Sequence, residues 1–250
     1  MVAKSVVKGN PIDRLMERAS GALESMRYLE AEKAAATALR RAHAASDFER
    51  MARIVLPLQE ARRQKRQLAV DSGARFIYAS LSGRRGGIKP GCYLFQPTLI
   101  AADARAFRET ADAKGIPVFV ITREPLTREG KWPVVGVNGT ISVRTRIDPP
   151  VKLERVDGAV TRDAIDEASE PPSAPWFEGA AEALGDTALA RLKPEDPAAW
   201  RVDDLMEFLE CHPDHEKLHQ RLTDECRLAM TQPLPEGRRH RPVVDDPFSF

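Results

Sequence analysis

Residues 12–68 carry a repeating pattern of small and apolar side chains, which commits this part of the chain to helix. Ala, Leu, Glu and Arg predominate, and all four favour helical structure. The apolar positions recur at steps of three and four, so they share one face of each helix. They are Leu15, Ala19, Ala22, Leu23 and Met26, then Ala31, Ala34, Ala35, Ala38, Leu39 and Ala42. Because most of them are alanines, two helix backbones can approach closely, and we expect an amphipathic hairpin.

The turn of this hairpin is expected at residues 27–32. The segment contains neither Gly nor Pro, so one continuous helix is the alternative there. A further helix is expected from Ser46 onward, with Ser46 as the N-cap and Glu49 completing a capping box. Pro57 should kink or interrupt that helix, because proline cannot donate a backbone hydrogen bond.

The string Tyr28-Leu29-Glu30-Ala31-Glu32, followed by Ala38-Leu39, resembles a tetratricopeptide repeat. In that family a small residue lets paired helices touch, an aromatic residue packs under the turn, and an Ala-Leu pair lies on the second helix. The segment from Ser46 is a poorer second copy, and Pro57 departs from the family pattern. The resemblance covers about a quarter of the chain. It implies an interaction scaffold that binds a protein or peptide near Tyr28, and a generic helical bundle is the alternative.

Composition limits the remaining possibilities. A chain of 250 residues can form one large or two small domains. No run of about 18 apolar residues occurs, so we expect no membrane span and no membrane partner. The N-terminus lacks the pattern of a signal peptide. Three cysteines are too few for a disulfide framework in a chain of this length, and we expect a cytoplasmic, reducing compartment.

Charge is divided unevenly along the chain. Residues 1–150 hold 26 Lys and Arg against 15 Asp and Glu, whereas residues 151–250 hold 12 against 22. The acidic part could therefore lie against the basic part within one molecule. Alternatively, basic residues 62–89 could bind nucleic acid. The cations considered for contact with a partner are Arg62, Arg63 and Arg66.

Residues 72–150 follow the helical domain of residues 1–71, and we expect them to form a small mixed α/β domain. β-prone runs at 75–81, 92–95 and 116–122 surround a helix that ends at Gly115, which predicts a right-handed βαβ unit. The sequence then predicts a β-hairpin at residues 133–146, with Asn138-Gly139 forming a type I′ turn.

A glycine-rich loop at residues 82–91 connects the first two of these strands. Arg84, Arg85 and Lys89 could bind an anion together with backbone amides freed by the glycines. The loop matches neither the phosphate-binding loop nor the dinucleotide fingerprint. A mobile connection with solvated charges is the alternative.

The last 100 residues are expected to contain an acidic helical region at 151–232 and a disordered tail at 233–250. The helical region begins with a linker at 151–175. The sequence predicts three helices after it, one of them interrupted near Gly185 and another capped by Asp196. Their expected ranges are 176–192, 197–210 and 213–230.

One group of residues in these helices could hold a metal ion: Cys211, His212, His215, His219 and Cys226. The run His215-Glu216-Lys217-Leu218-His219 resembles the signature of zinc metallopeptidases. The resemblance implies that His215 and His219 bind zinc and that Glu216 acts as a general base. A structural or adventitious metal site and ordinary surface histidines are the alternatives.

Taken as a whole, the sequence predicts an α+β protein with a tetratricopeptide-like helical N-terminus, a small central α/β domain and a C-terminal helical bundle. The leading hypothesis is a non-enzymatic protein-interaction or scaffold protein without a cofactor. Ser80, Ser82 and Cys92 have no identifiable histidine partner, so no catalytic set is recognised. A zinc-dependent hydrolase and a nucleic-acid-binding protein are the alternatives, and the oligomeric state stays open.

Overall fold

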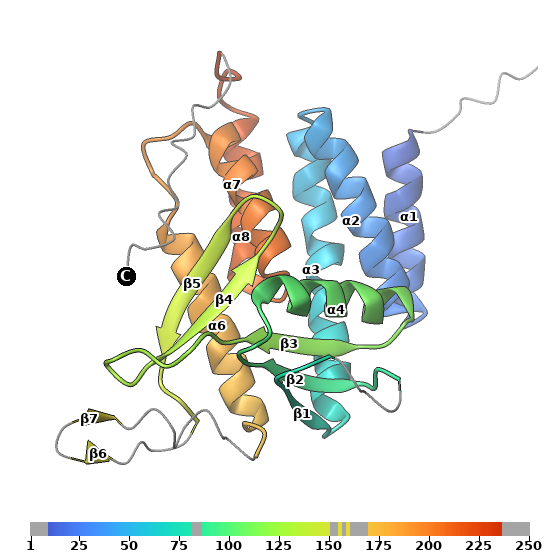
Figure 1. The fold of residues 1–250 in the computed structure, drawn as a ribbon. Coiled ribbons are helices and arrows are strands. Elements are labelled where there is room, and N and C mark those ends of the chain that lie inside the picture. The colour runs from blue at the N-terminus through green and yellow to red at the C-terminus, as the bar shows by residue number, and fades with distance from the viewer. Residues whose placement is uncertain (1–9, 82–86, 151–154, 157–158, 161–169, 237–250) are drawn as a thin grey trace, which may run out of the picture.

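The computed structural model describes residues 10–81, 87–150, 155–156, 159–160 and 170–236 (Figure 1). Helices and strands alternate in the middle of the chain, and helices alone make up its two ends. The expected mixture of helices with a small sheet is therefore confirmed. No helix in the described ranges has both the length and the apolar character needed to cross a membrane.

Three helices form the N-terminal region, as the two apolar stripes and the expected helix from Ser46 predicted, but the turn is not at residues 27–32. They are α1 (Pro11–Glu24), α2 (Tyr28–Ala44) and α3 (Phe48–Asp71). The turns contain Met26 and Ser46, whose φ angles of 55° and 51° reverse the chain without glycine. Residues 28–32 consequently belong to the first turns of α2, and the predicted position of the turn was wrong.

The start and the interior of α3 also differ from the prediction. Asp47, not Ser46, is the N-cap, and its carboxylate accepts the Arg50 amide hydrogen bond at 3.0 Å. The helix runs without interruption through Pro57 to Asp71. Tertiary packing of this long helix therefore offsets the local cost of an interior proline.

A three-stranded parallel sheet occupies the centre, in the order β1-β2-β3. Helix α4 connects β2 to β3, so the predicted βαβ unit is confirmed. Gly115, with a φ of 70°, follows α4 and ends it as expected. The elements are β1 (Arg75–Tyr78), β2 (Gly91–Phe95), α4 (Ala101–Ala113) and β3 (Val118–Thr122).

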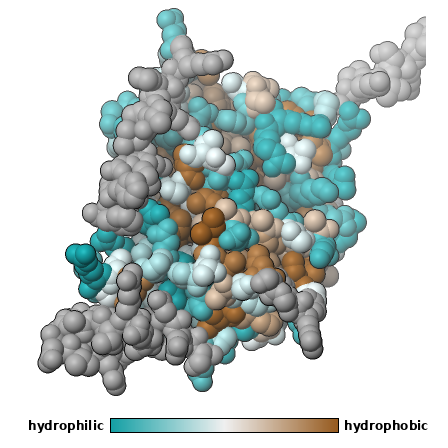
Figure 2. Space-filling model, in the orientation of Figure 1, coloured by the Kyte–Doolittle hydropathy of each residue, from teal (hydrophilic) through white to brown (hydrophobic). Residues whose placement is uncertain are grey.

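Alternate side chains of this sheet enter two different apolar clusters. Tyr93 and Phe95 pack beneath α4 with Phe107, whereas Cys92 and Leu94 belong to the main core on the other face. The main core is covered there by α3 and by the C-terminal helix α6 (Ala174–Ala190) (Figure 1). Figure 2 shows that hydrophilic side chains predominate over the N-terminal helices, while apolar ones gather lower down around α4 and the sheet.

The predicted hairpin is present as β4 (Trp132–Val137) and β5 (Ser142–Ile147). Its turn was predicted wrongly, because a type I′ turn requires positive φ angles and neither Asn138 nor Gly139 has one. Instead, the Asn138 side-chain oxygen accepts the backbone amides of Thr140 and Ile141 at 2.7 and 2.8 Å. A second, shorter pair is formed by β6 (Arg155–Val156) and β7 (Ala159–Val160).

Three helices lie within the described residues 170–236, as predicted, but their bounds and caps differ. Helix α6 continues through Gly185, so the expected interruption is absent, and α7 (Ala198–Cys211) has Pro197 rather than Asp196 as its N-cap. Helix α8 (Glu216–Ala229) begins three residues later than predicted, with His215 as its N-cap. Much of the expected linker, and residues 237–250 of the expected tail, lie outside the described residues.

Helix α3 lies between α2 on one side and α8 on the other, so the C-terminal helices cover part of the N-terminal helical layer (Figure 1). One main apolar core includes residues from both layers and from the sheet. Ion pairs also join the basic and acidic parts of the chain: Arg66 to Glu216 at 3.0 Å and His43 to Asp203 at 2.7 Å. The acidic helices therefore lie against the basic ones within one molecule.

Candidate functional site

A groove of about 1050 Å³ opens between α1, α3 and α8. Leu56 of α3 lies in it with 70 % of its surface exposed, and Met230 at the end of α8 is half exposed. Isolated exposed leucines are ordinary, but here several apolar side chains line one concavity. They are Met16, Leu23, Ala52, Leu56, Pro57 and Met230.

Charged side chains of both signs stand among the groove-lining residues. Glu49 lies 3.9 Å from Arg53 on α3, and Asp224 lies 3.5 Å from Arg227 on α8. All four side chains are largely exposed, so the attraction within each pair is weak and its members can contact a partner instead. The groove is thus lined by both apolar side chains and charges of both signs.

Pro57 adds a backbone acceptor to the same groove. Proline has no amide hydrogen, so the Arg53 carbonyl of α3 lacks the donor that a helix normally supplies four residues later. Both residues line the groove.

Tyr28 does not lie in this groove. It is the first residue of α2 and is half-buried. The predicted interaction residue and the groove are thus separate features, since the groove is formed by α1, α3 and α8.

Three of the four cations between residues 62 and 66 contact residues of other helices. Arg62 pairs with Glu32 at 3.0 Å, and Arg66 contacts Glu216 and the Asp214 carbonyl oxygen. Arg63 is the exposed member and pairs with Glu60 on its own helix. Lys65, the fourth, is the most deeply buried of them. The structure therefore uses Arg62 and Arg66 to join α3 to α2 and α8.

Lys65 and Glu32 form the centre of a buried charge cluster. Lys65 is 1 % exposed and contacts both Glu32 and Asp112. Burial alone would raise the pKa of Glu32, but Lys65 and Arg62 lower it to about 2. Burial would lower the pKa of Lys65, but Glu32 and Asp112 raise it above its ordinary value. Glu32 is therefore ionised at neutral pH, and the cluster fastens α3 to α2 and α4.

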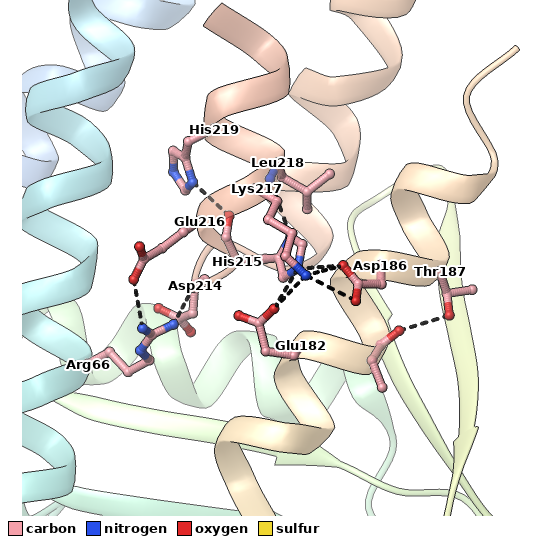
Figure 3. A network of polar contacts seen from close by, with 11 residues as sticks. Arg66, Glu182, Asp186, Thr187, Asp214, His215, Glu216, Lys217, Leu218 and His219 are labelled. Atoms are coloured by element: carbon pink, nitrogen blue, oxygen red, sulfur yellow. Dashed lines mark hydrogen bonds and ion pairs between the residues drawn. The ribbon is translucent and has the colours of Figure 1, made fainter. Parts of the chain in front are cut away.

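The two histidines of the metallopeptidase-like run point to different neighbours (Figure 3). His219 Nδ1 donates to the His215 carbonyl oxygen at 2.9 Å, and its Nε2 accepts from Arg62 at 3.1 Å. Burial, together with the charge of Arg62, lowers the pKa of His219 to about 3. With both nitrogens engaged, His219 does not join His215 in a ligand pair.

This separation follows from where α8 begins. His215 has an extended backbone and caps the helix, so its Nδ1 accepts the Leu218 amide at 3.3 Å. The metallopeptidase resemblance requires both histidines on one helix face. Glu216, expected as the base, pairs with Arg66 instead.

His215 turns its other nitrogen toward two carboxylates of α6. Its Nε2 lies 3.4 Å from Glu182 Oε2 and 3.4 Å from Asp186 Oδ1. This is the one group of three potential metal ligands that comes together within the described residues. Lys217 reaches the same carboxylates, at 3.2 and 2.9 Å (Figure 3). Its ammonium lowers the pKa of Asp186 below the ordinary value.

Gly185 fixes the ring of His215 against α6. A Cβ atom at this position would lie 2.0 Å from Cγ of His215, which is far inside the van der Waals distance. Helix α6 therefore needs glycine at this position to leave room for the His215 ring. The helix continues through Gly185 without interruption. Sequence analysis found His215 but missed Glu182 and Asp186, whose four-residue spacing on a helix was the available signal.

The two cysteines of the predicted metal group do not join the carboxylates. Burial raises the pKa values of the Cys211 and Cys226 thiols to about 12, so both are protonated at neutral pH. His212 is also buried, and burial lowers its pKa to about 4. These three side chains lie outside the group that His215 forms with α6.

The predicted anion-binding loop is described only in part. Arg84 and Arg85 lie outside the described residues. The Lys89 backbone accepts a hydrogen bond from the Tyr93 hydroxyl at 2.6 Å, and its side chain is exposed. An anion site therefore stays a prediction for this loop.

Comparison with known proteins finds no matching family model, no matching curated protein and no matching solved structure. Any functional conclusion for this chain therefore rests on its own geometry.

Proposed function

We propose that this chain is a non-enzymatic interaction protein that holds an amphipathic helix of a partner protein in the groove between α1, α3 and α8. The observation that carries the proposal is the exposure of Leu56 among the residues that line that groove. Burying a leucine side chain against a partner contributes about 1.5–3 kcal/mol. In this proposal the N-terminal helices act as a tetratricopeptide-like scaffold.

A helix is the partner structure that suits the groove best. The groove runs between helices, and α1 and α8 both pack on α3. An amphipathic helix would place apolar residues at steps of three and four against Leu56, Pro57 and Met230. Its flanking charges would meet Glu49 and Arg53 on α3 and Asp224 and Arg227 on α8.

The alternative of nucleic-acid binding has less support. Arg62, Lys65 and Arg66 are engaged by acidic or carbonyl groups of the same chain. Phosphate binding would require these cations to leave partners that also stabilise the fold. We assign the proposed interaction to the cytoplasm because all three cysteines are free and buried.

The test uses a displayed library of 20-residue helical peptides, selected on the full chain. Selected peptides should carry apolar residues at steps of three and four, and Leu56→Arg should weaken their binding by at least about tenfold. Leu68→Arg is the matched control, since Leu68 is an exposed leucine on the same helix that does not line the groove. It should leave the affinity unchanged.

Peptides that bind wild type and Leu56→Arg equally would overturn the proposal. Sedimentation of the full chain tests self-association. A dimer that Leu56→Arg dissociates would mean that a second copy fills the groove, and it would replace the partner helix.

A further inference from the structure

We propose that His215, Glu182 and Asp186 form a zinc-binding site that joins α6 to the start of α8, and that Lys217 competes with the metal ion for it. This site is separate from the groove and from the metallopeptidase-like pair. It uses one histidine of that run together with two carboxylates from a helix some 30 residues earlier in the chain.

The distances from His215 Nε2 to the two carboxylate oxygens already match those of a zinc site. Four ligands at about 2.1 Å from a tetrahedral zinc ion lie about 3.4 Å from one another. Both carboxylate oxygens lie 3.4 Å from His215 Nε2, and all three donor atoms lie within 4.8 Å of one another. Glu182 and Asp186 are four residues apart on α6, so one helix face presents both.

His215 supplies the second, independent observation. The residue is 1 % exposed, and its Nε2 has no hydrogen-bond partner of acceptable geometry among the described residues. A buried polar atom without a partner is costly. This atom faces the two carboxylates (Figure 3). The close packing of the ring on Gly185 holds it there. The site therefore has a fixed nitrogen donor and two more exposed oxygen donors.

The choice of zinc follows from the donor set. One imidazole nitrogen with two carboxylate oxygens suits zinc and related transition ions, whereas calcium and magnesium prefer oxygen alone. The remaining coordination position is left for water, because the carboxylates reach the solvent.

Lys217 acts as the internal competitor. Its ammonium bridges Glu182 and Asp186, but its side chain is 54 % exposed, so it can turn into solvent. Zinc would replace the Lys217 ammonium between the carboxylates, and its double positive charge would attract them more strongly. Removing the ammonium should therefore tighten zinc binding.

Zinc binding also moves one proton within the His215 ring. At present Nδ1 accepts the Leu218 amide, so Nε2 carries the proton. A neutral imidazole that binds zinc through Nε2 carries its proton on Nδ1, and the Leu218 amide then loses its acceptor. Occupation of the site is thus coupled to loosening of the first turn of α8.

The experiment titrates the metal-free full chain with zinc chloride by calorimetry. One zinc ion per chain should bind at this site. Glu182→Gln and Asp186→Asn should each weaken it at least about tenfold, and Lys217→Met should tighten it about tenfold. Glu178→Gln is the matched control, because it removes an exposed carboxylate one turn earlier on α6 without touching the site. Hydrogen exchange of the Leu218 amide should become faster when zinc is bound.

Absence of zinc binding in both wild type and Lys217→Met would overturn the proposal. Binding that survives Glu182→Gln and Asp186→Asn would do the same, because the ion would then lie elsewhere. Circular dichroism of each variant separates loss of ligands from loss of folding. Leu56→Arg should leave zinc binding unchanged, so failure of the groove proposal and failure of this one are distinguishable.

Discussion

The N-terminal half of α3 exposes Leu56 to solvent, whereas its C-terminal half buries the charged Lys65. The difference is explained by what each side chain meets. Lys65 finds two carboxylates from α2 and α4, so its burial is compensated. Leu56 faces a groove that no other part of the described chain fills. Along this helix, the partners available to a side chain decide whether it is buried, more than whether it is charged or apolar.

The largest expected effect on stability comes from removing Lys65, the buried charge of α3. Lys65→Ala should lower the free energy of unfolding by about 3–5 kcal/mol, because Glu32 and Asp112 lose their shared cation. Chemical denaturation measures the loss. Arg63→Ala is the control, since its pair with Glu60 is exposed, and it should change stability by less than about 1 kcal/mol. Equal losses in the two variants would contradict the structural role of Lys65.

Acid should lower the stability of the protein by protonating Glu32, the partner of Lys65. The pKa of Glu32 is lowered to about 2 in the folded chain, so its contribution is fully present above its ordinary pKa of about 4.5 and is lost as pH falls toward 2. The contribution is up to about 3 kcal/mol. Asp112 offsets part of it, because its pKa is raised in the fold.

Denaturation measured at several pH values between 5 and 2 should therefore show a steeper loss of stability in wild type than in Glu32→Gln. Parallel curves for the two proteins would show that Glu32 is not the group responsible.

A gain in stability is expected in the exposed half. Pro57→Ala restores an amide donor to the Arg53 carbonyl and removes a residue that disfavours helix interiors, so it should add about 1–3 kcal/mol. Thermal and chemical unfolding measure this gain. If the same variant also loses the helical peptides selected on wild type, Pro57 serves binding at the expense of stability.

The smallest expected effect sharpens the comparison at Leu56. Leu56→Arg should change the free energy of unfolding by no more than about 0.5 kcal/mol, since the side chain is already exposed. Leu58→Arg, two residues away and buried in the main core, should be strongly destabilising. A large loss in Leu56→Arg would mean that the groove is closed by the chain itself.

Regular periodicity predicted much of the fold. The βαβ unit followed from β-prone apolar runs on both sides of a helix, and the hairpin from two such runs joined by Asn138-Gly139. The Ala-rich stripes placed helices at the N-terminus. The turns were missed because Met26 and Ser46 adopt positive φ angles without being glycine. Conversely, Gly185 looked like a helix breaker but is required for contact with His215. Local signals for turns fail where tertiary packing selects the residue.

The candidate sites were less predictable. Histidine spacing drew attention to His215, yet its ligand partners come from another helix and their spacing is common on any exposed helix. The groove depends on three helices distant in sequence. Neither arrangement has a local pattern, because each requires knowing which helices pack together.

The sequence by itself determined the helical stripes, the parallel strand pair around α4 and the separation of basic and acidic parts, because these depend on side-chain period and composition. Only the tertiary structure decided where the charges and rings point. Because α8 begins at Glu216, His215 is its N-cap and turns away from His219. The packing of α3 against α8 decides that Arg62 and Arg66 are internal while Leu56 is not. Side-chain direction depends on helix start and on contacts between distant segments, and neither is a local property of the chain.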